Sequence, residues 1–562
     1  MGTVAERMTG VEVPSVESPT WLERVRADQG AILWMVVVVV VYVGATALLR
    51  LGDTIPQSGP PLDARGLPDR GMQLAINIVN GRWDLAPLPA EYDVVVRDGL
   101  LFQAISPLPI APYLLFVPFQ ALWAVAPRLV PMAVGIIAAW LALPLARRYG
   151  PEGNRPYWIA AFAAFGTLVF TQSVVGNIYY LAHVEAVACC FVALIEWRGR
   201  RRPWLIGLAL ALGSLARPTI LLAVIPFGIA LVWRGRTGRR IDGRAWLAFA
   251  LPIVAALVVT GLYDLVRFGS PFETGYGTTR INDVLAARRD LGVFSLRHVP
   301  DNLALLVAGG FGFQPGFPWL RPDPNGHSLL LTSPALLIAV GAGFRDRSLW
   351  PLYGSAALIA VPVLTYYGFG GWSTYGYRYA LDFIPFLIPL MAIAIRRQFG
   401  PLEQSLIALS VLFVGYGFVW AMFRPGCYGS APAGQVVQGD AAVVAVDVEA
   451  VAAKEPDERH PEPLGGLHRE VRRRRHGTDD RYAGDRGLLH DLEADPAADH
   501  EDPVVERERA GQQLRTNELV QGVVPADILA DLDELAAGRE QGGRVQATGL
   551  VEGALGGAQQ VR

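Results

Sequence analysis

The stretch that decides the fold class is residues 31–49, which read Ala-Ile-Leu-Trp-Met-Val-Val-Val-Val-Val-Val-Tyr-Val-Gly-Ala-Thr-Ala-Leu-Leu. No charged side chain interrupts it. A helix needs about 20 apolar residues to cross a hydrocarbon core about 30 Å thick, so this stretch predicts a membrane-spanning helix. The preceding segment, which contains Arg24 and Arg26, is too long for an ordinary signal peptide. We therefore expect a retained signal-anchor helix, with residues 1–30 in the cytoplasm.

At least nine further apolar segments follow this helix, and the chain is 52% hydrophobic and only 18% charged. Short groups of arginines separate many of these segments. Such groups mark the cytoplasmic loops of bilayer proteins, which makes nucleic acid an unlikely partner. The groups are Arg147 with Arg148, the arginines of 198–202 and 234–240, Arg345 with Arg347, and Arg396 with Arg397.

The sequence therefore predicts an all-α polytopic protein of the cell membrane, with about 11 transmembrane helices (a range of 9 to 13) within residues 31–423. One apolar run, at 108–123, contains Pro109, Pro112 and Pro118, which interrupt helical hydrogen bonding. We expect this run to lie in the interface or to re-enter the membrane. The paired spans are expected at 157–175 with 180–197, 204–215 with 217–233, 246–265 with 329–343, and 350–367 with 379–395, followed by a last span at 404–423.

This arrangement leaves two large loops on the extracytoplasmic side, residues 50–107 and 266–328. In the first loop, residues 72–83 have apolar positions at helical spacing, as in an interfacial helix. Residues 92–102 read as two short strands around the Asp98-Gly99 turn. We therefore expect a mixed α/β first loop.

Four fragments occur in an order that resembles a known group of membrane enzymes. They are Gly52-Asp53-Thr54, Arg97-Asp98-Gly99, Ala216-Arg217-Pro218-Thr219, and Arg267-Phe-Gly-Ser-Pro together with Gly376-Tyr377-Arg378-Tyr379. With this topology, the chain resembles the GT-C superfamily of polytopic glycosyltransferases, near the bacterial protein mannosyltransferases and lipopolysaccharide glycosyltransferases. The resemblance covers about residues 30–423 and rests on the order of the fragments, since none of them is diagnostic alone.

The resemblance implies a transferase that takes a sugar from a polyprenyl-phosphate donor at the outer face of the membrane. The acceptor would be a glycan, a lipid or a protein of the cell envelope. Members of this group carry a carboxylate in the first outer loop, in many cases two adjacent acids. Here Asp53 is followed by Thr54. No cofactor is therefore assigned, and the need for a divalent metal stays open.

Transfer of a sugar with inversion needs a base for the acceptor hydroxyl, and a positioned carboxylate contributes about 10²- to 10⁴-fold in that role. Asp53 is the first candidate, and Asp93 and Asp98 are the alternatives. Two of these three aspartates have a structural explanation as well. Asp53 could simply end a helix at the interface, and Asp98 could serve the hairpin turn with Gly99.

The departing phosphate needs positive partners, and guanidinium groups pair with phosphate oxygens bidentately. Arg378, flanked by Tyr377 and Tyr379, is the first candidate, although Tyr and Arg also anchor helices at interfaces. Arg217 interrupts a long apolar stretch, where a charge costs roughly 2.5–3.5 kcal/mol on insertion scales. It either contacts phosphate or lies at a turn between two short helices.

Three further residues are candidates for contact with the substrate, namely Glu273, Tyr276 and His183. Glu273 and Tyr276 belong to the second outer loop. His183 and Glu185 diverge by about 200° on a helix, so a shared metal site is not expected. Neither the three cysteines nor any other pattern in the sequence predicts a metal site.

Residues 424–562 differ sharply in composition from the rest of the chain. From residue 425 onward they carry about 26 acidic and 15 basic side chains, two tyrosines, and no Phe or Trp. Little apolar periodicity is present to build a core, so we expect disorder. The abrupt change suggests a shifted reading frame or unrelated coding sequence, and no function is assigned to this segment.

Two other classes of protein remain open. A transporter would show two similar halves and acids at mid-membrane, neither of which is evident here. A non-catalytic membrane scaffold could keep the fold without the base. Turnover of a polyprenyl-phosphate sugar, as opposed to flux of a small solute, would separate these classes.

Overall fold

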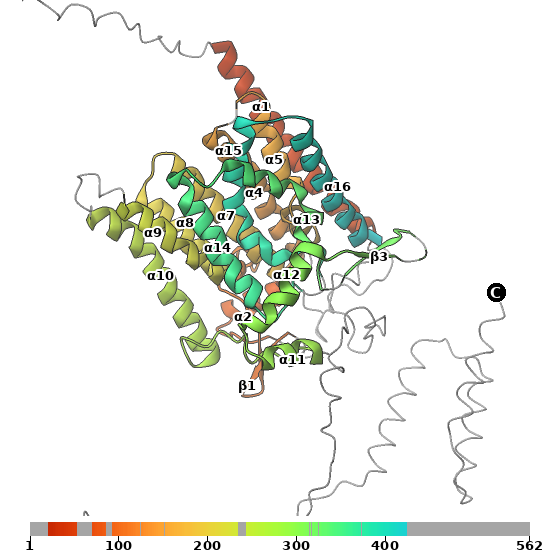
Figure 1. The fold of residues 1–562 in the computed structure, drawn as a ribbon. Helices are drawn as coiled ribbons and strands as arrows, with labels where there is room; N and C mark the ends of the chain where they lie inside the picture. Colours follow the sequence, from red (N-terminus) through yellow and green to blue (C-terminus); the bar gives the residue numbers. More distant parts are fainter. Residues whose placement is uncertain are drawn as a thin grey trace, which may run out of the picture. The chain divides into compact units, whose positions relative to one another are not determined.

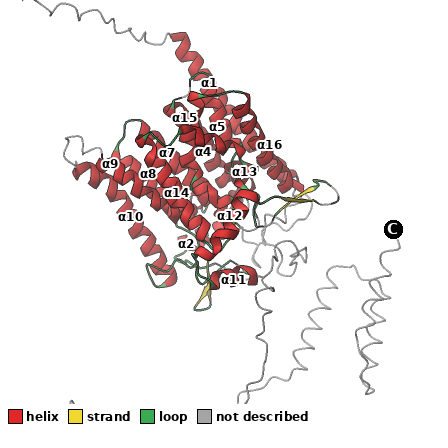
Figure 2. Ribbon diagram, viewed as in Figure 1, coloured by secondary structure: helices red, strands yellow, loops and turns green. Residues whose placement is uncertain are grey.

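The apolar segments fold into a bundle of helices in the computed structural model (Figure 1). The structure describes residues 21–52, 70–85, 93–123, 125–150, 152–233, 243–313, 315, 317–323, 325–371 and 374–423. The expected tail at 424–562, most of the segment at 1–30, and Asp53 lie outside these ranges. Helices dominate the described part, and the strands are confined to two hairpins (Figure 2).

The helices of the first half of the chain are α1 (Trp21–Gly52), α2 (Arg70–Val79), α3 (Ala111–Leu114), α4 (Ala126–Tyr149), α5 (Arg155–Phe165), α6 (Val169–Val175), α7 (Ile178–Arg198), α8 (Pro203–Ala216) and α9 (Val224–Trp233). Those of the second half are α10 (Gly243–Phe268), α11 (Asp283–Asp290), α12 (Val299–Ala308), α13 (Leu329–Thr332), α14 (Trp350–Thr365), α15 (Ile384–Arg397) and α16 (Pro401–Phe423). Several 3-10 turns connect them, among them η1 (Leu108–Ile110), η2 (Gln120–Leu122), η3 (Pro218–Ala223), η6 (Pro334–Ala342) and η8 (Arg378–Asp382).

Six of the described helices are long and apolar enough to cross a membrane, and the count becomes seven if α5 and α6, bent by 45°, form one span. Five of the six lie within α1, α4, α7, α10 and α16, and the other, Arg347–Thr365, joins a short 3-10 turn to α14. The chain is therefore an all-α membrane protein with several spans. Two shorter apolar helices, 203–216 and 218–231, fall below this length. The expected total of 11 crossings depends on such short elements and stays a prediction.

The 108–123 run does not form a long helix. It folds into η1, α3 and η2, which are each three or four residues long. Its three prolines remove backbone donors, which disfavours a continuous helix here. None of these turns is long enough to cross a bilayer.

Arginines from separate loops gather at one end of the bundle. Arg155, at the start of α5, donates to the carbonyls of Ile395 and Arg396 at the end of α15 (both 3.2 Å). Arg397 donates to the carbonyl of Ala342 at 2.7 Å. These guanidinium groups satisfy carbonyls that helix ends leave without partners. The bundle thus has one basic end.

The other end of the bundle holds α2, β1 and α11, which lie together in Figure 1. Strand β1 (Val95–Arg97) pairs antiparallel with β2 (Leu100–Phe102). Asp98 and Gly99 connect them with positive φ angles of 51° and 72°. This is the two-residue turn whose twist matches the flanking strands. Most of α2 is buried in a second hydrophobic core, in which Met72 packs with residues of α4, α7 and α10.

The second hairpin pairs β3 (Phe311–Phe313) with β4 (Leu320–Pro322). Tyr416 of α16 donates to the carbonyl of Leu320 at 2.8 Å, which holds this hairpin on the bundle. Helix α7 is the most enclosed of the candidate spans, with 78% of its most apolar window buried. It lies between α4 and α8, so residues at its first turns are surrounded by other elements.

Candidate functional site

A cavity of about 70 Å³ opens at the end of the bundle opposite the basic end. A water molecule needs about 10–15 Å³ by the same measure, so the cavity holds several waters. Polar and aromatic side chains dominate its wall. They include Asp93, Ser106, Tyr179, His183, Arg217, Tyr276, Thr279, Tyr366, Tyr367, Arg378 and Tyr379.

One side of this cavity is organised by a carboxylate, Asp382, that is fully buried. Its Oδ1 accepts a hydrogen bond from Nδ1 of His183 at 2.8 Å. Its Oδ2 accepts from Nε of Arg217 at 3.2 Å and from the hydroxyl of Thr219 at 2.6 Å. A buried carboxylate needs such partners because the bare charge is poorly solvated in a protein interior. Two segments of the chain, one at His183 and one at 217–219, are therefore tied to the side chain of Asp382.

Arg217 occupies a break between helices. Its backbone is extended (φ −137°, ψ 112°) between the end of α8 and the start of η3. Pro218 follows directly and disfavours continuation of α8 through Arg217. The side chain is only 18% exposed and is paired with Asp382. The tertiary partner explains how this charge is accommodated inside an apolar stretch of sequence.

The ring of Tyr379 lies among the cationic groups. The guanidinium of Arg217 is 5.5 Å from the centre of this ring, and that of Arg378 is 5.2 Å from it. The imidazole of His183 is 5.8 Å away, centre to centre. Aromatic faces attract cations, so one tyrosine supports both guanidinium groups at the cavity.

The position of the Arg378 side chain requires a glycine at residue 371. A Cβ at Gly371 would overlap the side chain of Arg378, and the φ of +129° at this position disfavours other residues. The Nε of Arg378 is buried and makes no hydrogen bond to the described part of the protein. Arg378 thus keeps hydrogen-bonding capacity beside the cavity, which suits an anionic ligand.

Asp93 is held at the cavity by contacts with a second loop, which contains Arg280. Its N–H donates to the carbonyl of Arg280 at 2.6 Å, and the N–H of Arg280 donates to Val94 at 2.8 Å. The hydroxyl of Tyr179 donates to the carbonyl of Asp93 at 3.4 Å. The φ of Asp93 is 58°, a left-handed conformation that Asp tolerates better than most residues. These contacts fix the backbone of Asp93 at the wall of the cavity, beside Tyr179.

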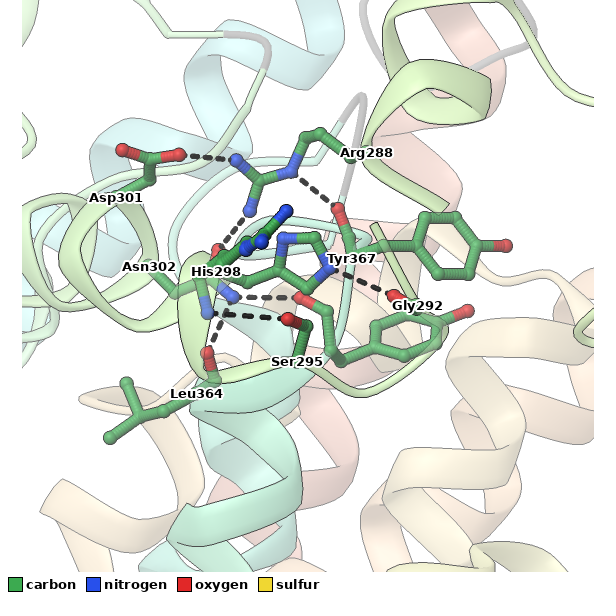
Figure 3. A network of polar contacts seen from close by, with 10 residues as sticks. Arg288, Gly292, Ser295, His298, Asp301, Asn302, Leu364 and Tyr367 are labelled. Carbon is green, nitrogen blue, oxygen red and sulfur yellow. Dashed lines mark hydrogen bonds and ion pairs between the residues drawn. The ribbon is translucent and has the colours of Figure 1, made fainter. Parts of the chain in front are cut away.

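Tyr366 and Tyr367 are positioned by the loop that contains Arg288 and Asn302, and Figure 3 shows the contact of Arg288 with Tyr367. Asn302 donates to the carbonyls of Leu364 and Tyr366, both at 2.8 Å. Arg288 donates to the carbonyl of Tyr367 at 2.8 Å and to Oδ1 of Asn302 at 3.2 Å. The end of α14 would otherwise leave these carbonyls without partners. The loop thereby orients two aromatic side chains that line the cavity.

Tyr276 lies on the cavity wall in the same loop. Burial raises the pKa of its phenol above the ordinary value, so the group stays neutral and can both donate and accept hydrogen bonds. Its ring is 6.2 Å from that of Tyr366, in an edge-to-face arrangement. The hydroxyl of Thr279, nearby on the wall, donates to the carbonyl of Gly275 at 2.6 Å.

The structure brings together five of the residues singled out in the sequence, namely Asp93, His183, Arg217, Tyr276 and Arg378. The other described candidates do not line this cavity. The side chain of Asp98 is 83% exposed and lies beside Arg97. Glu273 accepts a hydrogen bond from the N–H of Gly275 at 2.8 Å. Tyr377 is buried, and its place on the wall is taken by Tyr379. The first candidate base, Asp53, is outside the described residues.

Sequence reasoning missed the organising residue, Asp382, and its partner Thr219. A signal was present, because Arg217 and Asp382 are lone opposite charges within or beside apolar segments. Such charges usually pair inside the bundle. The pairing of these two, together with His183, could have been proposed on that ground. Tyr366 and Tyr367 carried no comparable signal, since tyrosines at helix ends are common.

Comparisons of this chain with protein-family models, with curated proteins and with solved structures found no match. Within the described residues, no three His, Cys, Asp or Glu side chains lie close enough to hold a metal ion.

Proposed function

We propose that the protein is a membrane glycosyltransferase that moves a sugar from a polyprenyl-phosphate donor to a cell-envelope acceptor. The observation that carries this proposal is a single cavity that combines two guanidinium groups, Arg217 and Arg378, with a carboxylate, Asp93. Cationic partners stabilise a departing phosphate, and a carboxylate can remove the proton of an attacking hydroxyl. Aromatic walls suit the apolar faces of a sugar ring.

The position of the cavity supports a lipid-linked donor. It opens at the end of the bundle opposite the gathered arginines, which the positive-inside rule assigns to the cytoplasm. In the proposed arrangement the N-terminus is cytoplasmic, about 11 segments cross the cell membrane, and the first outer loop contributes the base. A phosphate at Arg378 would lie near the bilayer surface, where the headgroup of a lipid donor is found.

In the proposed reaction, the acceptor oxygen attacks the anomeric carbon of the donor sugar and Asp93 takes its proton. The bond between the anomeric carbon and the phosphate oxygen breaks, and the electron pair leaves with the phosphate. Arg217 and Arg378 stabilise the added negative charge on that phosphate. The products are the glycosylated acceptor and polyprenyl phosphate.

The test uses the purified full chain in lipid nanodiscs with a panel of polyprenyl-phosphate sugars, and it measures release of polyprenyl phosphate. Asp93→Asn keeps the shape but removes the proton acceptor, so turnover should fall about 10²- to 10⁴-fold with donor binding retained. Asp98→Asn is the matched control, because Asp98 is exposed and belongs to the same loop. Full activity in Asp93→Asn would refute its role, and loss in Asp53→Asn would move the base to Asp53. No turnover of any donor, together with flux of a solute, would instead favour a transporter.

A further inference from the structure

We propose that His183 recognises a hydroxyl group of the substrate, and that Asp382 is the positioning residue that gives it this specificity. The inference deepens the proposed function and rests on it. His183 lines the same cavity as Arg217 and Arg378, yet its hydrogen bonding makes it chemically unlike them. Two arginines can only donate hydrogen bonds, whereas His183 is held as an acceptor.

The tautomer of His183 follows from its partner. The carboxylate of Asp382 can only accept hydrogen bonds, and Oδ1 lies 2.8 Å from Nδ1 of His183. Nδ1 therefore carries the proton. In a neutral imidazole the other nitrogen, Nε2, then has a free lone pair and no hydrogen. Nε2 makes no hydrogen bond to the part of the chain that the structure describes, and the side chain faces the cavity.

The charges around His183 favour the neutral ring. Asp382 is shared with Arg217 and Thr219, so its charge is already partly neutralised. Arg378 and Arg217 both contact the Tyr379 ring, which also neighbours the imidazole. A protonated His183 would add a third cation to this group. Asp93 is the acidic residue that lines the cavity itself, whereas Asp382 is buried behind His183 and Arg217.

A lone pair on Nε2 repels phosphate oxygens and attracts a hydroxyl hydrogen. The phosphate of a donor is therefore expected at Arg217 and Arg378, and a sugar hydroxyl at His183. A site that hydrogen-bonds a substrate hydroxyl discriminates strongly against a ligand that lacks it, because the buried group is then left without a partner. His183 would thus distinguish sugar-linked lipid from the bare lipid phosphate that is the product of transfer.

The test compares two probes on the full chain in nanodiscs, namely farnesyl phosphate and a panel of farnesyl-phosphate hexoses and pentoses. The measured quantity is the sugar increment, defined as the Kd of farnesyl phosphate divided by that of the tightest sugar-linked probe. In His183→Phe the increment should fall about tenfold, while the Kd of farnesyl phosphate stays within about twofold. The amide oxygen of the Gln in His183→Gln can accept a hydrogen bond, so this variant should keep part of the increment. It also keeps the test decisive if His183→Phe does not fold.

Three results would overturn the inference. The first is equal weakening of both probes in His183→Phe, which would mean that His183 contacts phosphate. The second is an unchanged increment in that variant, and the third is the absence of any increment in the parent protein. If farnesyl phosphate binds and Arg378→Ala weakens it, the phosphate site of the proposed function survives any of these outcomes. If the parent protein binds neither probe, the proposed function fails together with the inference.

Discussion

Asp382→Asn tests the buried cluster directly, because it removes one charge and almost no volume. The carboxylate is fully buried and accepts three hydrogen bonds, from His183, Arg217 and Thr219. Removing one partner of a buried ion pair costs about 3–5 kcal/mol. The side chain of Arg217 is 18% exposed, so cavity water offsets part of the loss. We therefore expect a loss of about 3 kcal/mol in the free energy of unfolding, at the lower end of that range.

The same change should also reverse the tautomer of His183. The amide oxygen of the substituted side chain would serve Arg217 and Thr219, which leaves its NH₂ group facing Nδ1. Because that group donates, Nδ1 becomes an acceptor and the proton moves to Nε2. In ¹⁵N spectra of histidine-labelled protein, the two nitrogens of His183 should exchange their protonated and unprotonated shifts.

The stability assay is the thermal unfolding midpoint in one detergent, with Asp98→Asn as the matched control. Asp98 is 83% exposed, so the same chemical change there should leave the midpoint unchanged. Equal midpoints for the two variants would refute the reasoning, because they would show that the Asp382 charge has no buried partner. An unchanged His183 spectrum in Asp382→Asn would separately refute the tautomer assignment.

Three further predictions concern the loops. Asn302→Asp replaces an NH₂ group, which donates to the carbonyls of Leu364 and Tyr366, by a carboxylate oxygen that can only accept. Each buried carbonyl left without a hydrogen bond costs about 1–3 kcal/mol, so the unfolding midpoint should fall. Burial lowers the pKa of His327 to about 4, so the neutral ring contributes its full stabilisation above about pH 6.5 and loses it as the pH falls toward 4. The unfolding midpoints at pH 7 and pH 5 should therefore differ more in the parent protein than in His327→Gln. The same pH dependence in both proteins would contradict the assignment of this effect to His327. Reporter fusions at residues 90, 285 and 374 should score extracytoplasmic and those at 150, 200 and 346 cytoplasmic, and an outside score at 150 would invert the later loops.

The membrane class of this protein could be predicted from sequence because hydrophobicity is a local property. An uncharged run such as 31–49 must be helical in a bilayer, whatever surrounds it, since no water is present to satisfy its backbone. The Asp98-Gly99 turn is equally local, because its positive φ angles suit those two residue types. The number of crossings was harder to predict, since short elements such as α8 and η3 do not reach the length of an ordinary span.

The cavity could be predicted only in part. Arg378 and Asp93 stood out by residue type, but their meeting depends on loops that are remote in sequence, such as the contact of Asp93 with Arg280. Asp98 looked similar to Asp93 in sequence, yet the hairpin turns it toward solvent. A one-dimensional pattern does not say which of two neighbouring acids faces a cavity, because that depends on the register of the loop.

The sequence by itself determined that the chain has several membrane-spanning helices, that groups of arginines separate many of its apolar segments, and that charged and aromatic residues collect in other loops. Only the tertiary structure decided that Asp382, His183 and Arg217 share one buried cluster. Arg217 and Asp382 are 165 positions apart in the sequence. The physical reason is the low polarity of the interior. A buried charge must find its partner wherever the fold brings one, and that partner is chosen by packing and not by distance along the chain.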